Sequence, residues 1–87
     1  MRGGISWSRK QRLGTNLTEA NMLSANLRRA DLNEAILTRA NLQQADLSGA
    51  DLSGANMEGV EGITEKELEE QAGSLEDATM PNGTVRD

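Results

Sequence analysis

A five-residue phrase repeats without interruption through the middle of the chain, from residue 15 to residue 59. Each copy has a small residue, then Asn or Asp in all copies but one, then Leu or Met, and then two variable residues. The apolar positions are Leu17, Met22, Leu27, Leu32, Leu37, Leu42, Leu47, Leu52 and Met57. The small positions are Thr15, Ala20, Ala25, Ala30, Ala35, Ala40, Ala45, Ala50 and Ala55. Internal repetition of this kind is stronger evidence for the fold than local propensity.

The five-residue step excludes two simple folds. On an α-helix, with about 100° per residue, five residues advance the side chain by about 140°, so the leucines would not share a face. In a flat strand the side chains alternate, so successive leucines would point to opposite faces. Both apolar series can point inward only if the chain turns a corner in every repeat. We therefore predict a solenoid, in which each coil stabilises its neighbours.

The polar residue of the repeat favours the corner. It is Asn16, Asn21, Asn26, Asp31, Asn41, Asp46, Asp51 or Asn56. Side chains of Asn and Asp bond to backbone groups about two residues on, which stabilises turns. Parallel stacking of the coils then pairs the backbone groups, with a rise of roughly 4.8 Å per coil. The spacing alone leaves open whether a coil has three sides or four.

The series Ala-Asn-Leu at 25–27 and 40–42 and Ala-Asp-Leu at 30–32, 45–47 and 50–52 resembles the pentapeptide-repeat family. This resemblance implies an all-β fold, a right-handed four-sided parallel β-helix with four repeats in each coil. Residues twenty apart would then be stacked, for example Leu32 over Leu52. The ending at 75–83 is similar to that of small cyanobacterial members, many of which have no assigned role.

Both flanks are suited to cover the ends of the solenoid, which otherwise expose apolar core and unpaired backbone. Residues 1–14 hold four basic residues and no acidic one, and Ser6 and Gly14 favour a short helix between them as an N-terminal cap. A frayed tail is the alternative. Thr64 and Glu67 match a capping box that predicts an acidic helix over 64–72.

We expect Leu68 to anchor this helix on the core and Gly73 to end it. The five-residue spacing then returns at Leu75, Met80 and Val85, with a tight turn predicted at 81–83. With 87 residues the chain forms one domain. We divide it into a basic N-terminal cap (1–14), the β-helix (15–63), the helix excursion (64–72), and a returning wall or, alternatively, a loose C-terminal tail (73–87).

The composition argues against catalysis. The chain has no His, Cys or Tyr, so a Ser-His or Cys-His nucleophile pair cannot be built. We predict no enzyme activity, no cofactor and no metal. The stacked carboxylates of Asp31 and Asp51, with Asp46 nearby, suggest calcium as an alternative. Corner formation explains them more simply, because Asn occupies the same position of the repeat.

Departures from the repeat are the candidate contacts with a partner. Arg28 and Arg29 put two cations on one wall, and Ile36 replaces the polar residue and should face outward. Trp7 is the single aromatic residue. We predict a protein-binding or scaffold module whose protein partner is unidentified. We also predict weak end-to-end self-association, because the two ends have opposite charge: residues 1–14 are basic, and residues 60–87 hold eight acids and two bases.

The alternative function is that of a DNA mimic that inhibits or protects a type II topoisomerase, as some members of the family do. B-DNA carries one charge per about 1.7 Å, so a rod of about 11 Å would need roughly six negative charges. Residues 15–59 hold six acids but also three arginines, which gives about half of that density. Direct binding of nucleic acid is disfavoured by the net charge of −5.

No apolar run approaches the roughly 20 residues of a membrane span, and the first residues lack the apolar stretch of a signal peptide. We therefore expect a cytoplasmic protein without a membrane segment.

Overall fold

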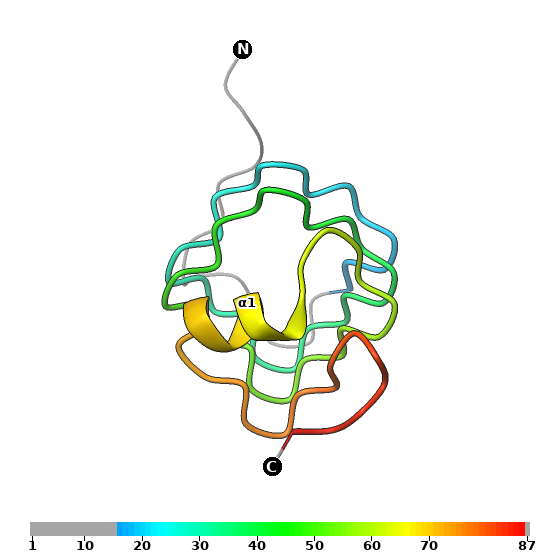
Figure 1. The fold of residues 1–87 in the computed structure, drawn as a ribbon, viewed down its shortest axis with the longest axis vertical. Coiled ribbons are helices and arrows are strands. Elements are labelled where there is room, and N and C mark those ends of the chain that lie inside the picture. The colour runs from blue at the N-terminus through cyan, green and yellow to red at the C-terminus, as the bar shows by residue number, and fades with distance from the viewer. Residues whose placement is uncertain (1–15, 87) are drawn as a thin grey trace.

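The computed structural model of the chain describes residues 16–86, and within them the backbone winds into a solenoid (Figure 1). Parallel β-bridges join residues that lie twenty apart, as in Asn16 with Ile36 and Asn21 with Asn41. Because the repeat is five residues long, the chain returns to the same position after four repeats. A coil therefore has four sides, which the spacing alone could not decide.

We name the four sides walls A to D by their bridging residues. Wall A has its rungs at residues 16, 36, 56 and 79, and wall B at 21, 41 and 61. Wall C has rungs at 26 and 46, and wall D at 31, 51 and 74. Coil 1 comprises residues 16–35, coil 2 residues 36–55 and coil 3 residues 56–78.

Each rung is a single bridge, and no continuous strand occurs within residues 16–86. The reason is the corner after each rung. At the first corner the Ala20 N–H donates to the Leu17 carbonyl at 2.9 Å, and Glu19, third in the turn, has a φ of 60°. A positive φ at that position alone is the arrangement of a type II turn. The chain can therefore extend for only about two residues between corners.

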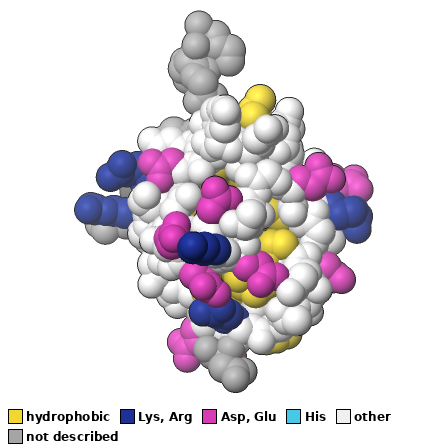
Figure 2. Space-filling view, viewed as in Figure 1, with side chains coloured by type: hydrophobic (Ala, Val, Ile, Leu, Met, Phe, Trp, Pro, Cys, Tyr) yellow, Lys and Arg dark blue, Asp and Glu magenta, His cyan; other side chains and the backbone are white. Residues whose placement is uncertain are grey.

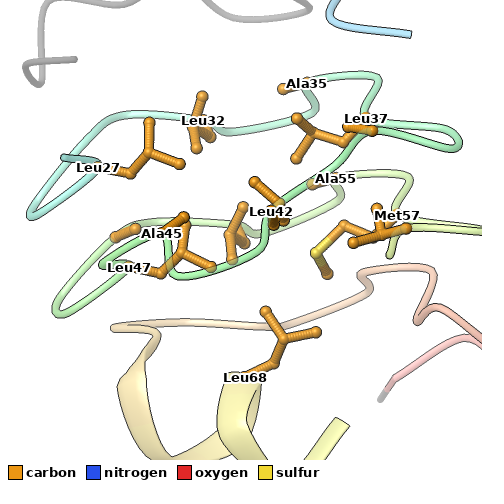
Figure 3. Packing of buried hydrophobic residues seen from close by; sticks show 14 of the residues in the cluster. Leu27, Leu32, Ala35, Leu37, Leu42, Ala45, Leu47, Ala55, Met57 and Leu68 are labelled. Carbon is orange, nitrogen blue, oxygen red and sulfur yellow. The ribbon is translucent and has the colours of Figure 1, made fainter. Parts of the chain in front are cut away.

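The core is a column of the repeat's apolar side chains (Figure 3). Leu17 and Ala20, at the first rungs, are half-buried. The buried members of the repeat are Met22, Ala25, Leu27, Ala30, Leu32, Ala35, Leu37, Ala40, Leu42, Ala45, Leu47, Ala50, Leu52, Ala55 and Met57. Val60, Leu68, Ala78 and Met80 extend the core beyond the repeat.

Coil 3 contains the helix α1, Glu65–Gln71, in the place of wall C. Thr64 is its N-cap, and the predicted capping box with Glu67 is present: the Glu67 N–H donates to Thr64 Oγ1 and the Thr64 N–H to the Glu67 carboxylate. Figure 1 shows α1 lying across the end of the coil, and Figure 3 shows Leu68 pointing from it toward the core. The helix thus covers part of the C-terminal end of the core.

The wall resumes after α1 with a shift in register. Asp51 bridges to Ser74 and Asn56 to Thr79, a separation of 23 residues where the earlier coils have 20. The helical segment therefore inserts three residues into the coil. Of the two alternatives that the sequence left open after the helix, the returning wall describes residues 74–80.

Gly73 has a different role from the predicted one. The C-cap of α1 is Ala72 in an extended conformation, and Gly73 is not among the residues with positive φ, so it does not end the helix by a left-handed turn. A Cβ at Gly73 would lie 2.8 Å from the Gly49 carbonyl oxygen, so this position needs glycine for close packing against coil 2.

Val85 does not continue the returning wall, although it has the same five-residue spacing as Leu75 and Met80. Val85 is 63% exposed and bridges Thr79 in the antiparallel sense. The turn predicted at 81–83 is present, with the Gly83 N–H donating to the Met80 carbonyl at 2.8 Å. Because this turn reverses the chain, residues 84–86 run back along the last rung of wall A and do not begin another wall.

Candidate interaction surfaces

Wall C carries the two cations that the sequence singled out, side by side on the first coil. Arg28 Nη1 lies 3.6 Å from Asp46 Oδ2 of the next coil, and both side chains are exposed. The aliphatic part of the Arg29 side chain packs over the equivalent corner of coil 2, since a Cβ at Gly49 would lie 3.3 Å from Arg29 Cγ. Arg28 is therefore already paired within the wall and offers less free charge than the sequence implies.

Asp46 is held as a carboxylate by its own corner. Ser48 donates to Asp46 Oδ1 from its hydroxyl at 2.7 Å and from its backbone N–H at 3.0 Å. These two bonds lower the pKa of Asp46 below its ordinary value; desolvation opposes them, and the charge of Arg28 adds a lowering smaller than either bond. The same side chain thus forms the corner and balances a cation.

Wall A carries Ile36 between Asn16 and Asn56, with its side chain 38% exposed. It bridges its neighbours through the backbone, as the other members of the series do, but it has no oxygen to receive the N–H of Thr38. The same wall holds an ion pair between coils, with Arg39 Nε 3.0 Å from Glu19 Oε2. Ile36 is therefore a single outward aliphatic side chain on a wall whose Arg39 is already paired.

Two further apolar side chains are exposed, Leu23 on wall B at 45% and Val85 in the terminal segment. The sequence interpretation did not single out Leu23, although a signal exists, because it is the one leucine at a variable position of the repeat. Trp7, the remaining candidate contact, and the basic cap at 1–14 lie outside the described residues.

Wall D is acidic throughout its three rungs. Its outward acids are Asp31, Glu34, Asp51, Glu76 and Asp77. These three rungs have no Lys or Arg, and none of the five acids forms an ion pair with a residue in the described range. Glu76 and Asp77 join it only because the chain returns to register after α1, so the sequence did not reveal the wall as one surface.

The carboxylates of Asp31 and Asp51 bridge in adjacent coils, as the fold predicts. Each accepts the backbone N–H two residues on, from Asn33 at 3.2 Å and from Ser53 at 3.0 Å. Within residues 16–86 no group of three or more acidic side chains is arranged to hold a metal ion. These two carboxylates therefore have an observed structural use in the corners.

The face that carries α1 holds several acidic side chains around patches of apolar atoms (Figure 2). Arg86 of the terminal segment pairs there with Glu69 of α1. No pocket opens in the described part of the chain. The candidate sites are therefore walls and ends rather than a cavity.

The helix α1 lacks the length and apolarity to cross a membrane, and residues 16–86 contain no other helix.

A family model described as pentapeptide repeats matches the chain in eight copies, over residues 13–33 and 25–61, which together make more than half of it. Among solved structures, the chain is similar to HetL, a pentapeptide repeat protein involved in heterocyst differentiation regulation from the cyanobacterium Nostoc sp. strain PCC 7120. The identity is 33% and the TM-score 0.73, over 85% of this chain and 33% of HetL. The chain thus spans about a third of that protein's length. Both matches imply the right-handed four-sided β-helix. No curated protein matches the chain.

Proposed function

The chain belongs to the pentapeptide-repeat family, and we propose that it is a non-enzymatic scaffold that binds a basic protein partner through wall D. The carrying observation is the distribution of charge among the walls. Arg39 on wall A and Arg28 on wall C are paired with acids of the neighbouring coil, whereas the described rungs of wall D have five acids and no cation. A surface of one sign attracts a partner of the opposite sign and speeds its association.

The backbone of wall D favours binding because it is ordered before the partner arrives. Asp31 and Asp51 are fixed by their corner bonds, and the hydroxyls of Ser53 and Ser74 lie 2.7 Å apart between two rungs. Side chains that are already held lose little conformational entropy on binding. A partner with Lys or Arg side chains spaced like the rungs, roughly 4.8 Å apart, would meet one acid row at each coil.

The walls first singled out from the sequence are less suited to this role. Arg28 is engaged with Asp46, and Ile36 is a single aliphatic side chain, which is common on protein surfaces. A partner that used Arg28 and Arg29 would have to displace Asp46 from its ion pair. We therefore place the partner on wall D.

The test is quantitative affinity capture from the native cell with the wild-type chain and a wall D variant, Glu34→Gln, Asp51→Asn, Glu76→Gln and Asp77→Asn. Asn at position 51 keeps the corner acceptor, and Asn tolerates the positive φ of 61° at position 77. We expect the variant to lose partners that the wild type retains at low salt. A control variant, Glu58→Gln and Glu61→Gln, changes acids of walls A and B. Equal capture by the wild type and the wall D variant would contradict the proposal.

DNA mimicry is the second candidate, and the same wall favours it. Wall D holds five acids over three coils, a height of about 14 Å at roughly 4.8 Å per coil, where B-DNA would show roughly eight charges. This local density exceeds the average of the whole repeat, because the arginines lie on other walls. A gyrase supercoiling assay tests it. Unchanged supercoiling in a large excess of the protein would eliminate this function.

A further inference from the structure

The last described residues form a small hairpin that covers one edge of the solenoid. The Met80 N–H donates to the Thr84 carbonyl at 2.7 Å, and the Arg86 N–H donates to the Ala78 carbonyl at 2.8 Å. On earlier rungs of wall A the equivalent N–H groups, such as that of Leu37, are paired with the next coil. The hairpin therefore takes the place of a further coil on wall A.

The turn of this hairpin contains Asn82, which differs from the other asparagines in having a glycine as its C-terminal neighbour. In the repeat each Asn precedes Leu or Met, and Asn33 precedes Glu34. Asn82 precedes Gly83, which has a φ of 89°, and both residues are exposed. A glycine leaves the backbone nitrogen after the asparagine without steric cover, and a residue with a side chain does not.

The Asn82 side-chain oxygen is held by two donors from one residue. Thr84 donates to Oδ1 from its backbone N–H at 3.1 Å and from its hydroxyl at 2.7 Å. Both bonds draw electron density from the carbonyl, which makes Cγ more electrophilic. They also point at the oxygen that would carry negative charge if a nucleophile added to Cγ, as donors do in an oxyanion hole.

We propose that Asn82 is a site of self-modification, at which the Gly83 nitrogen attacks Asn82 Cγ and expels the side-chain amide as ammonia. The Gly83 nitrogen loses its proton to solvent base and forms a bond with Asn82 Cγ. The bond between Cγ and Nδ2 of Asn82 then breaks, and Nδ2 takes up a proton and leaves as ammonia. The product is a five-membered cyclic imide. Water then adds to either imide carbonyl and opens the ring to aspartate or to isoaspartate, with no oxidant or cofactor.

The position of the turn lets this reaction proceed in the folded protein. The Gly83 N–H is bonded to Met80, so the hairpin has to open before the nitrogen can react. Residues 82–86 are all exposed, and segments with few buried contacts open locally at a small fraction of the global free energy. The two bonds from Thr84 to Asn82 span only three residues, so they can persist while the hairpin opens.

The modification would uncover wall A. Isoaspartate adds one carbon to the main chain within a tight turn, so the two hairpin bonds at Met80 and Arg86 cannot both re-form. The contact of Arg86 with Glu69 depends on the same segment. Conversion of Asn82 therefore leaves the backbone of the last rung of wall A without its hairpin partner, irreversibly. Coils 1 and 2 keep their own hydrogen bonds.

The test is incubation of the full chain in water enriched in ¹⁸O, followed by proteolysis and mass spectrometry of each asparagine-containing peptide. We expect ¹⁸O in the peptide with residue 82 at least tenfold faster than in the peptide with Asn16, as both isoaspartate and aspartate. Asn16 is a matched internal control, because Thr18 gives its Oδ1 the same two bonds, at 3.0 and 2.6 Å, but Leu17 comes after it. Equal rates at the two positions, or aspartate alone as product, would overturn the proposal.

Two variants separate the parts of the mechanism. Thr84→Val removes the hydroxyl donor and keeps the size of the side chain, so we expect slower conversion; unchanged or faster conversion would refute the role of Thr84. Asn82→Gln should show no conversion on the same timescale, because its ring would have six members. In the converted protein the amide of Met80 should exchange hydrogen faster and that of Leu37 should not. Unchanged protection of Met80 would contradict the uncovering of wall A.

Discussion

Wall C is built from rungs in coils 1 and 2, whereas coil 3 has the helix α1 in the same place. On wall C of coil 1, the N–H groups of Leu27 and Arg29 donate to carbonyls of coil 2, at 2.8 and 2.9 Å. In coil 2 the equivalent donors are Leu47 and Gly49, and the next coil has α1 in the place of a rung. Gln71 receives both donors, the first on its side-chain oxygen at 2.9 Å and the second on its carbonyl at 2.8 Å.

This difference shows what an interruption of the repeat requires. Backbone donors that face the interruption need acceptors, because a partly buried N–H without a partner costs free energy. One glutamine at the end of the helix supplies two acceptors at the required spacing. The chain must also leave and re-enter the wall without collision, and glycine occupies both places, at Gly62 and Gly73.

The largest expected effect is at Gly62, where the chain leaves wall B for α1. A Cβ there would lie 2.5 Å from both the Cα and the N of Gln43, and the φ of Gly62 is 89°. Neither backbone atom can move without shifting coil 2. We expect Gly62→Ala to lower the free energy of unfolding by about 3 kcal/mol or more, from left-handed strain and a backbone clash together. Urea denaturation followed by circular dichroism measures it.

The control lies in a regular corner. A Cβ at Gly54 would lie 3.1 Å from Glu34 Cγ, which belongs to a flexible exposed side chain, and its φ is 70°. We expect Gly54→Ala to cost only about 1 kcal/mol, from the backbone conformation. Equal losses at Gly54 and Gly62 would show that the exit to the helix is no more constrained than an ordinary corner.

A smaller effect is expected when the acceptor of Gln71 is removed. Gln71→Met keeps the length of the side chain and the backbone carbonyl but leaves the Leu47 N–H without an acceptor. We expect a loss of about 1–3 kcal/mol, the cost of an unpaired donor with little access to water. Gln44→Met is the control on an exposed corner, where we expect a change within about 0.5 kcal/mol. Similar small losses for both variants, again from urea denaturation, would refute the bridging role of Gln71.

The regular coils were predictable from sequence because the repeat states the same constraint many times. The inward Leu and Ala, the corner bonds and the capping box at Thr64 each depend on residues within five positions of one another. The resemblance supplied four sides where the spacing left three or four. These features follow from local geometry, which a repeat displays directly.

The features that the sequence did not reveal depend on residues that come together only through the register. Gln71 meets Leu47 because the helical segment shifts the coil by three residues, and no spacing in the sequence states that shift. Glu76 and Asp77 reach wall D for the same reason. Val85 has the five-residue spacing of an inward residue, but the turn at Pro81 reverses the chain before it. The acidic wall was therefore missed, while Arg28 and Arg29 stood out as neighbours in sequence.

A still smaller effect is expected where a regular coil lacks its corner bond. Asn56 accepts the Glu58 N–H at 3.1 Å, whereas Ile36, one coil earlier, offers no acceptor to Thr38. We expect Ile36→Asn to raise the free energy of unfolding by about 0.5 kcal/mol, the net value of one exposed hydrogen bond. The reverse change, Asn56→Ile, should lower it by a similar amount. Calorimetric melting that moves both variants in the same direction would show that the bond does not set the stability of the corner.

The smallest expected effect concerns Asp46, in a corner with both a hydroxyl and a backbone donor. Because these bonds from Ser48 lower the pKa of Asp46 in the folded protein, its contribution to stability is present above the ordinary carboxyl pKa of 3.8. That contribution is lost as the pH falls through the lowered value. We expect Ser48→Ala to raise the pKa of Asp46, since the hydroxyl is the largest cause of its lowering, and Ser53→Ala on wall D to leave it unchanged. Titration of the side-chain carboxyl carbon by NMR measures both. If Ser48→Ala left the pKa of Asp46 where it is, Arg28 and the backbone N–H would have to hold the charge by themselves.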